Sequence, residues 1–264
     1  MRIATWNVNS VRLRLDNTLA WLAERQPDVV CLQEIKCQDD QFPREAFEAA
    51  GYNVAVHGQK SYNGVAVLSR LPFDEVTTGL PGDGDDVQSR FIEVVVSRPG
   101  GGVVRVCGIY LPNGNPPDDP TKYPYKLAWM ARLKAHIAAR LELEEPLIVA
   151  GDYNVIPEPE DAAHPEMWVR DALFLPRTRA AFRAIENLGL TDAVRASSDA
   201  AGLYTFWDYQ AGAWQKNNGI RIDHLLLSPQ AADLLKGVGI DKHVRSWEKP
   251  SDHVPVWADL DIAA

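Results

Sequence analysis

Short apolar runs alternate along this chain with longer segments in which apolar residues recur at intervals of three and four. Short runs rich in Val, Ile and aromatic residues predict β-strands. These runs span Arg2–Asn7, Val29–Glu34, Val54–His57, Gly64–Leu68, Phe91–Val96, Val103–Tyr110, Leu147–Asp152, Tyr204–Trp207, Gly219–Leu227 and Val254–Leu260. The longer segments predict helices over roughly Leu13–Glu24, Pro43–Ala49, Lys122–Leu143 and Thr178–Leu188.

The order of these elements favours two packed sheets over one parallel sheet. Gly100–Gly101–Gly102 separates two strand-like runs as a hairpin loop would, and Pro- and Gly-rich stretches at Leu80–Asp86 and Pro112–Pro120 indicate surface loops. Hairpins amid α/β crossovers are typical of mixed sheets covered by helices. We find no internal repeat or linker, so the 264 residues predict a single domain, 1–264, of the α/β (α+β) class.

Several predicted strands carry polar side chains at or near one end. The run that ends at Ala150 leads into Gly151 and Asp152, and the spacing of Asp152 and Asn154 puts both side chains on one side of an extended backbone. Comparable groups at other strands are Asn7, Glu34, Tyr110, Asp223 and the pair Asp252–His253. Taken singly, each is equally typical of a turn, a cap or a solvated strand end. Together they favour a magnesium-dependent phosphoryl site.

Composition and charge narrow the class of protein. The chain is 46% hydrophobic and 24% charged, as in a soluble globular protein. No apolar run approaches the ~20 residues that cross a bilayer. Three cysteines without a close pair indicate neither a disulfide framework nor a zinc site, and with an N-terminus unlike a signal peptide they predict a cytoplasmic protein. The net charge of −9 argues against sequence-independent coating of DNA, but not against a phosphodiester substrate.

A series of sequence blocks runs from Met1 to about Leu260. The blocks are Ile3–Arg12, Leu32–Lys36, Gly51–Asn53, His57–Lys60, Gly64–Ser69, Tyr110–Gly114, Gly151–Asn154, Arg221–Asp223 and Ser251–Val256. In this order they resemble the exonuclease III class of abasic-site endonucleases, within the larger endonuclease/exonuclease/phosphatase superfamily. The resemblance implies a four-layer α/β sandwich, with two packed mixed β-sheets flanked by helices and an active site where strand ends converge.

The resemblance also implies a magnesium site for one or two ions, at which Mn²⁺ is expected to substitute. Glu34 is then the main ligand, with Asn7 and Asp252 beside it. Some relatives have a second metal position, and the matching residues here are Asp152, Asn154 and His253.

Catalytic roles follow from the same resemblance. Asp152 would orient or deprotonate the attacking water, and Asn154 would help to hold the phosphate. His253, oriented by Asp223, would bind the scissile phosphate and stabilise its developing negative charge, and Tyr110 would contact the same phosphate. A cation and a His–Asp pair are suited to this task because in-line attack places charge on the phosphoryl and departing oxygens.

DNA contacts are expected from basic and aromatic residues. Arg90 and Lys122 match positions at which relatives contact DNA, and Arg221 is a weaker candidate, as are Lys36, Lys60 and Lys216. The matching aromatic segment implies that Phe206, Trp207 and Ile220 line a pocket for a flipped-out abasic sugar. Packing in the core is the alternative for these aromatics.

Together, the resemblance implies a magnesium-dependent DNA-repair phosphodiesterase. It would act on double-stranded DNA with abasic sites or blocked 3′ ends, cleaving 5′ to abasic sites as a monomer that contacts no membrane. It would also have 3′-phosphodiesterase, 3′-phosphatase and 3′→5′ exonuclease activity. The alternatives are another enzyme of the superfamily, such as a nonspecific deoxyribonuclease or a lipid or inositol phosphatase, and a binding module that kept the fold without its chemistry. The blocks His57–Lys60 and Tyr204–Asp208 favour the abasic-site branch.

Overall fold

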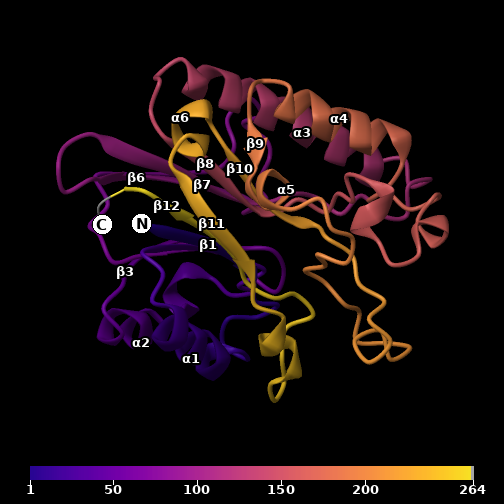
Figure 1. The fold of residues 1–264 in the computed structure, drawn as a ribbon, viewed down its shortest axis with the longest axis horizontal. Coiled ribbons are helices and arrows are strands. Elements are labelled where there is room, and N and C mark those ends of the chain that lie inside the picture. Colours follow the sequence, from indigo (N-terminus) through magenta and orange to yellow (C-terminus); the bar gives the residue numbers. More distant parts are fainter. Residues whose placement is uncertain (263–264) are drawn as a thin grey trace.

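The computed structural model describes residues 1–262, within which two six-stranded sheets pack together between layers of helices (Figure 1). The first sheet has the order β11 (Leu235–Ile240), β12 (Val256–Leu260), β1 (Arg2–Asn7), β2 (Val29–Gln33), β4 (Val65–Ser69) and β3 (Asn53–His57). The second has the order β5 (Glu75–Thr78), β6 (Phe91–Ser97), β7 (Val103–Tyr110), β8 (Leu147–Asp152), β10 (Asp223–Leu227) and β9 (Thr191–Asp192). Each sheet contains one parallel pair, β1–β2 or β7–β8, so both are mixed. The predicted four-layer sandwich is confirmed.

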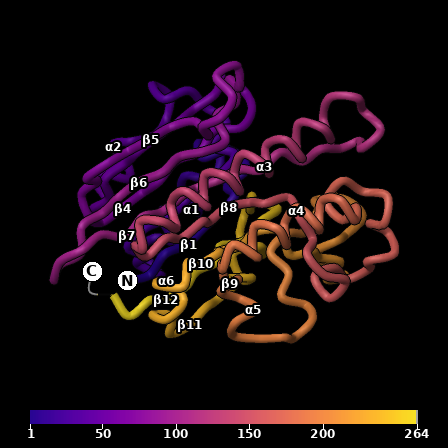
Figure 2. Tube along the Cα trace, turned by 90° about the horizontal axis from the view of Figure 1, so that it is seen from above, coloured from indigo at the N-terminus to yellow at the C-terminus, as the bar shows by residue number. Residues whose placement is uncertain are grey.

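Helices cover both outer faces of the paired sheets. In Figure 1, α1 (Leu15–Arg25) and α2 (Arg44–Ala49) lie on one side, and α3 (Lys122–Leu141) and α4 (Pro176–Glu186) on the other. Figure 2 shows α3 and α4 as neighbours over the second sheet. The remaining helical pieces are short: α5 (Ala193–Ser197), α6 (Pro229–Ala232), η1 (Asp39–Gln41), η2 (Pro159–Asp161), η3 (Pro165–Met167) and η4 (Lys242–Ser246). Among the described residues, no helix combines the length and the apolar character needed to cross a membrane.

The sequence of α3 explains how this helix packs. Tyr123, Met130, Leu133 and Ile137 recur at intervals of seven, three and four, and all four side chains are buried. Residues at this spacing lie on one face of a helix. Lys126 falls on the same face and is fully buried as well. The apolar face of α3 therefore carries a lysine into the protein.

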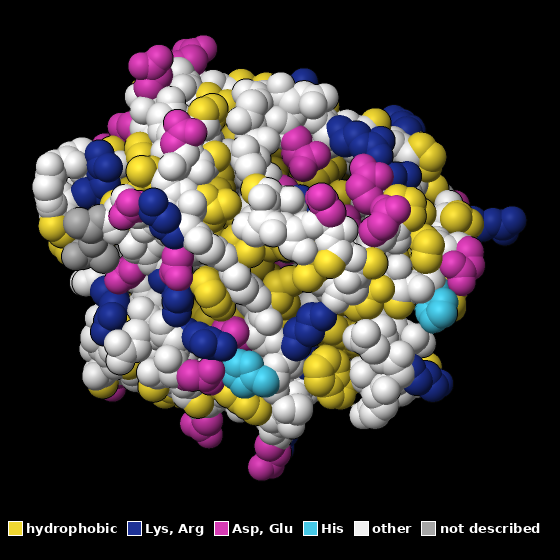
Figure 3. Space-filling view, viewed as in Figure 1, with side chains coloured by type: hydrophobic (Ala, Val, Ile, Leu, Met, Phe, Trp, Pro, Cys, Tyr) yellow, Lys and Arg dark blue, Asp and Glu magenta, His cyan; other side chains and the backbone are white. Residues whose placement is uncertain are grey.

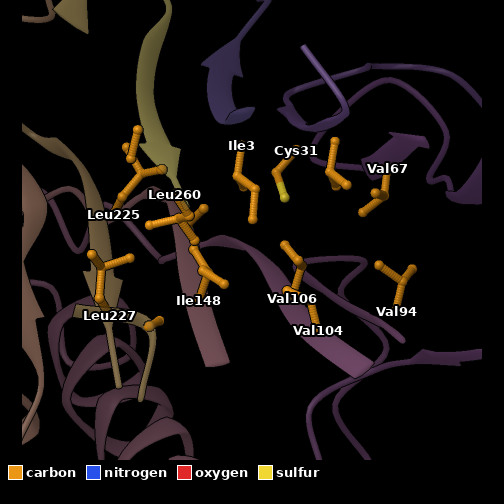
Figure 4. Packing of buried hydrophobic residues seen from close by; sticks show 14 of the residues in the cluster. Ile3, Cys31, Val67, Val94, Val104, Val106, Ile148, Leu225, Leu227 and Leu260 are labelled. Atoms are coloured by element: carbon orange, nitrogen blue, oxygen red, sulfur yellow. The ribbon is translucent and has the colours of Figure 1, made fainter. Parts of the chain in front are cut away.

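Aliphatic side chains fill the space between the two sheets. Figure 4 shows part of this core, with Ile3, Cys31, Val67 and Leu260 from the first sheet and Val94, Val104, Val106, Ile148, Leu225 and Leu227 from the second. Burying one Val, Leu or Ile side chain contributes roughly 1.5–3 kcal/mol. Two further apolar clusters lie between the sheets and their covering helices. The strands are thus held rigidly, which fixes the positions of the residues at their ends.

The structure corrects several predicted boundaries. The expected strand Tyr204–Trp207 is wrong, because Phe206 makes only isolated bridges to Ile220 and His253. The run Gly219–Leu227 becomes a strand only from Asp223 onward. Strands β5, β9 and β11 were not predicted. β5 lies at a sheet edge with all four side chains exposed, and β11 contains two glycines, so neither has the alternation of a half-buried strand.

Candidate active site

The ends of five strands meet at one edge of the sandwich. The parallel pair β1–β2 sets Asn7 next to the end of β2, which Glu34 follows. The parallel pair β7–β8 sets Tyr110 beside Asp152, and antiparallel β10 sets Asp223 on the other side of Asp152. Parallel neighbours end at the same edge of a sheet, so the register gathers the polar residues within each sheet, and the packing of the two sheets brings the two groups together.

A cleft of about 310 Å³ opens at this edge. Its lining residues are Glu34, Tyr110, Asn113, Asn115, Asp152, Asn154, Trp168, Asp171, Leu173, Phe206, Asp208, Ile220, Ile222, Asp252 and His253. Asn7 and Asp223 lie directly behind them, since both are fully buried and hydrogen-bond to lining residues. The structure therefore brings all the predicted catalytic and metal-binding residues into one site.

Three of these residues form a cluster that could hold a cation. Glu34, Asp152 and His253 each offer a ligand atom, and the three atoms lie within 4.8 Å of one another. Asn7 Nδ2 donates to Glu34 Oε1 at 2.9 Å and to Asp152 Oδ2 at 3.0 Å. Two carboxylates so close together repel each other unless a positive charge or a proton intervenes. Carboxylate oxygens with an imidazole nitrogen are a donor set that divalent cations accept, so the residues present fit a bound metal ion.

Asn7 and Asp252 lie beside the three-residue cluster but are not part of it. Asn7 Oδ1 accepts from the backbone N–H of Asn9 at 3.0 Å, so its NH₂ group faces the carboxylates. Asp252 lines the cleft, and its Oδ1 accepts from Asn9 Nδ2 at 3.0 Å. Lys36 Nζ lies 2.8 Å from Glu34 Oε2. Burial opposes ionisation of Glu34, but Lys36 and other hydrogen-bond donors outweigh it and lower the pKa of Glu34. Direct coordination by Asn7 or Asp252 stays a prediction.

His253 and Asp223 form a buried pair. His253 Nδ1 lies 2.8 Å from Asp223 Oδ2, which also accepts from Thr205 Oγ1 at 2.6 Å. His253 Nε2 lies 3.7 Å from Asp152 Oδ2. Burial would lower the pKa of His253, but the carboxylates of Asp223 and Asp152 outweigh burial and raise it to about 10. A protonated imidazole can donate from Nε2 to an anionic oxygen in the cleft while Asp223 holds Nδ1.

Asp152 is suited to accept a proton. Burial raises the pKa of Asp152 to about 7, although His253 and the hydrogen bond from Asn7 oppose this effect. Its Oδ1 accepts the backbone N–H of Asn154 at 2.9 Å, and its Oδ2 accepts from Asn7. The carboxylate is therefore held in one orientation. A carboxylate with a pKa near neutrality can serve as a general base.

Tyr110 forms the next part of the cleft wall, and Arg90 packs beside it. Tyr110 Oη donates to Glu34 Oε1 at 3.0 Å, and burial raises the pKa of Tyr110, with Glu34 and Asp152 adding to the effect. The guanidinium of Arg90 lies 4.7 Å from the centre of the Tyr110 ring, and its Nη1 donates to the Tyr110 carbonyl at 3.2 Å. Arg90 thus supports Tyr110 in this structure. Its predicted contact with DNA stays a prediction.

The apolar side of the cleft is formed by Phe206, Ile220 and Ile222. The Phe206 ring lies edge-on to His253, with centroids 4.9 Å apart. Trp207 does not share this position. It is fully buried, its Nε1 donates to Asn217 Oδ1 at 3.2 Å, and its ring packs against Trp214. The prediction that Trp207 contacts DNA is therefore wrong, because neighbouring side chains cover the indole.

The prediction that Arg221 contacts DNA is also wrong. It is 1% exposed, and its guanidinium donates to Asp161 at 2.7 Å and to Asp192 at 2.6 Å. Its hydrogen-bond donors are engaged inside the protein, so a phosphate cannot reach them. Lys122, by contrast, is exposed at the start of α3, outside the residues that line the cleft.

Several residues of the site were not singled out by the sequence. Asn113 lines the cleft, and its Nδ2 donates to Asn154 Oδ1 at 3.0 Å. Its position in the sequence block Tyr110–Gly114 could have indicated that it belongs to the site. Trp168 and Asp171 come from a loop without apolar periodicity, so their place in the cleft could not be foreseen. They also border an adjoining cavity of about 440 Å³.

Comparison with known proteins identifies the family. The model of the Endonuclease/Exonuclease/phosphatase family matches residues 4–253. The chain belongs to this family. It is 34% identical over 267 residues to exodeoxyribonuclease III of Haemophilus influenzae, covering 98% of this chain and 100% of the relative. The family assignment predicted from the sequence blocks is confirmed.

Solved structures agree with this assignment. The Neisseria 3′ phosphatase NExo, bound to a product DNA hairpin, superposes with a TM-score of 0.94 at 39% identity, and the match covers 99% of each chain. An AP endonuclease from Archaeoglobus fulgidus superposes with a TM-score of 0.91 at 35% identity, again over 99% of each chain. The chain therefore shares its whole fold with nucleases and phosphatases that act on DNA.

Proposed function

We propose that this chain is a magnesium-dependent DNA-repair phosphodiesterase that cleaves 5′ to abasic sites. It leaves a 3′-hydroxyl and a 5′-deoxyribose phosphate, removes blocking groups such as phosphates from 3′ ends, and degrades duplex DNA from the 3′ end. The carrying observation is the cluster of Glu34, Asp152 and His253, backed by Asp223 and set beside an apolar wall. Relatives named as exodeoxyribonuclease III, 3′ phosphatase and AP endonuclease support this range of activities.

The roles of the residues follow from their hydrogen bonds. Asp152, fixed by Asn7 and by the N–H of Asn154, accepts a proton from the attacking water. His253, held by Asp223, donates from Nε2 to a phosphate oxygen and stabilises the charge that develops there. Tyr110, whose hydroxyl donates to Glu34 in this structure, turns that hydrogen towards the phosphate, and the Asn154 side chain helps to hold the phosphate. Asp152 and His253 are held in their orientations before substrate arrives, so these two groups need little reorganisation during the reaction.

Glu34 is the main residue that would hold the metal ion, together with Asp152 and the nearby Asn7 and Asp252. A bound Mg²⁺ supplies Lewis-acid stabilisation of the phosphoryl and leaving oxygens. Mn²⁺ substitutes because the carboxylate oxygens suit both ions. A second ion would use Asp152, Asn154 and His253, and His253 would then have to give up its Nε2 proton to serve as a ligand. Dependence on a metal ion is a property of the family to which the chain belongs, and the cluster of Glu34, Asp152 and His253 fits it.

Local rather than overall charge holds the DNA. The net charge is −9, and Figure 3 shows basic and acidic side chains interspersed over one face of the molecule. Arg90, Lys36 and the exposed Lys122 supply positive charge in or near the cleft. Each phosphate contact releases counterions, so binding weakens steeply as salt is added.

The lesion is selected by fit to the cleft. Phe206 and Ile220 offer an apolar surface to a deoxyribose, and the volume of about 310 Å³ is shared with the catalytic groups and the phosphate. A nucleotide without a base is the easiest to unstack and flip, because it has no stacking or pairing to lose. We also infer that the chain acts as a monomeric single domain in the cytoplasm, without a membrane partner.

A substrate panel tests this function. Purified protein is incubated with an abasic-site duplex, a 3′-phosphate duplex, an undamaged duplex and a phosphoinositide, each with Mg²⁺ or with EDTA. We expect incision of the abasic duplex and dephosphorylation of the 3′ end, both abolished by EDTA. Preference for the undamaged duplex would favour a nonspecific deoxyribonuclease, and preference for the phosphoinositide a lipid phosphatase. No activity on any substrate would leave a binding module and refute the proposal.

A further inference from the structure

Lys126 is a buried polar residue to which the proposed chemistry gives no role. It is 0% exposed, and its Nζ donates to the backbone carbonyls of Asn154 at 2.6 Å and Asn113 at 3.0 Å. Burial lowers the pKa of Lys126 to about 7, although Asp152 and Asp171 oppose this effect. Burying an amine against two uncharged carbonyls is costly, so Lys126 requires an explanation.

The two carbonyls belong to residues whose side chains line the catalytic cleft. Asn113 Nδ2 donates to Asn154 Oδ1 at 3.0 Å, and Asn154 Nδ2 donates to the carbonyl of Leu111 at 2.9 Å. These side-chain bonds join the segment after β7 to the segment after β8. Lys126 joins the same two segments through their backbone carbonyls. The two asparagines are therefore held both by their side-chain hydrogen bonds and by the hydrogen bonds from Lys126 to their carbonyls.

The backbone at this point depends on such support. Asn154 has φ +48°, a left-handed conformation that is uncommon for residues other than glycine, although asparagine adopts it more readily than most. The bond from Lys126 holds the Asn154 carbonyl in the orientation that this conformation requires. Gly114 packs on the lysine stem, since a Cβ built at Gly114, where φ is +85°, would lie 2.8 Å from Lys126 Cδ. The loop after β7 therefore rests directly on the lysine.

We propose that Lys126 is a positioning residue that sets the Asn154 side chain in the cleft, both by holding the Asn154 carbonyl and by holding Asn113, whose side chain donates to Asn154. The inference rests on the proposed function, because it assigns Lys126 a part in the same reaction. This role depends on the N–H donors of Lys126 and not on its charge, because even a neutral amine has two N–H hydrogens for the two carbonyls. Lys126 acts through Asn154 and does not touch the substrate.

A double-mutant cycle tests this role. Lys126→Met removes both donors with little change of length, and Asn154→Ala removes the side chain that Lys126 is inferred to place. The matched control is Lys242→Met, because Lys242 is a partly buried lysine that donates to the Gly202 carbonyl at 2.6 Å outside the cleft. Single-turnover rates and KM are measured on the abasic duplex, and thermal unfolding is followed for every variant.

We expect Lys126→Met to lower kcat at least about tenfold with little change in KM, because a displacement of 1 Å in a catalytic group can cost on the order of 10²-fold. The double variant should be no slower than Asn154→Ala alone, because both substitutions remove the same interaction. Lys242→Met should leave kcat unchanged.

A Lys126→Met variant with kcat within about twofold of wild type would overturn the inference, as would effects that multiply in the double variant. If Lys126→Met does not fold, Lys126→Gln, whose shorter side chain changes the reach of the donors, replaces it in the same cycle with the same two outcomes. A wild-type protein inactive on the panel refutes the proposed function. A slow Asn154→Ala with a normal Lys126→Met refutes only the role of Lys126.

Discussion

Replacing Asp223 by Asn is the most informative single change in the catalytic site. Asp223 is fully buried, and its Oδ2 accepts from both His253 and Thr205. The pKa of His253 rises from 6.5 to about 10 in the folded protein, with Asp223 as the strongest raising influence. At about 1.4 kcal/mol per factor of ten, this rise corresponds to roughly 5 kcal/mol in favour of the imidazolium, shared with Asp152 and Asp252.

Asp223→Asn keeps the size of the side chain but removes the charge that holds His253 protonated and oriented. We expect kcat for abasic-site incision to fall on the order of 10²–10³-fold, the usual cost of losing one donor to a developing oxyanion. KM should change little, because the interaction strengthens only as charge develops. The assay is single-turnover incision of a labelled abasic duplex at saturating enzyme.

Asp259→Asn is the matched control. Asp259 pairs with Arg2 at 2.7 Å on β12 and lies outside the cleft. The same substitution there should leave kcat at the wild-type value. If Asp223→Asn retained kcat within about threefold of wild type while folding normally, the assignment of His253 as the phosphate-binding donor would be refuted.

Three further predictions concern the residues around the site. Arg221→Met leaves the buried Asp192 without its arginine and leaves Asp161 with Arg195 as its remaining arginine, so it should destabilise the fold by about 3–5 kcal/mol in urea unfolding. Lys122→Met should leave the midpoint of urea unfolding unchanged. DNA-binding measurements at several salt concentrations should show that it reduces the slope of log affinity against log salt by about one. An unchanged slope would show that Lys122 does not contact the DNA. The pKa of Glu93 is lowered to about 2 by His136 and nearby arginines despite burial, so its ionised form stabilises the fold above its ordinary pKa of 4.5. Stability should therefore fall between about pH 4.5 and pH 2 in the wild type, and much less in Glu93→Gln; parallel profiles would refute this reading.

Much of the active site could be predicted because it lies at strand ends. A buried strand has a clear apolar signature, and the residue that follows it inherits a defined position at the sheet edge. Asp152, Glu34 and Asn7 were placed in this way. Their meeting also required the parallel pairings β1–β2 and β7–β8, which the sequence does not state residue by residue.

The errors came from burial that local sequence does not encode. Arg221 follows Ile220 near the start of β10, where an arginine is usually solvated, but Asp161 and Asp192 come from distant segments and neutralise it inside the protein. Trp207 lies next to Phe206, and only the tertiary fold decides which ring faces the cleft. Lys126 could have been noticed, because it interrupts the apolar stripe of α3 at a buried position.

Mapping the ends produced from an abasic-site duplex tests the central claim most directly. Wild-type protein and Glu34→Gln, purified in parallel, are incubated with the duplex in Mg²⁺ and in EDTA, and the products are resolved against markers for each type of end. The proposed function predicts a 3′-hydroxyl and a 5′-deoxyribose phosphate from wild-type protein in Mg²⁺, and uncut duplex in EDTA and from Glu34→Gln. Cleavage that persists in EDTA, equal cleavage by Glu34→Gln, or a break on the 3′ side of the lesion would contradict the account.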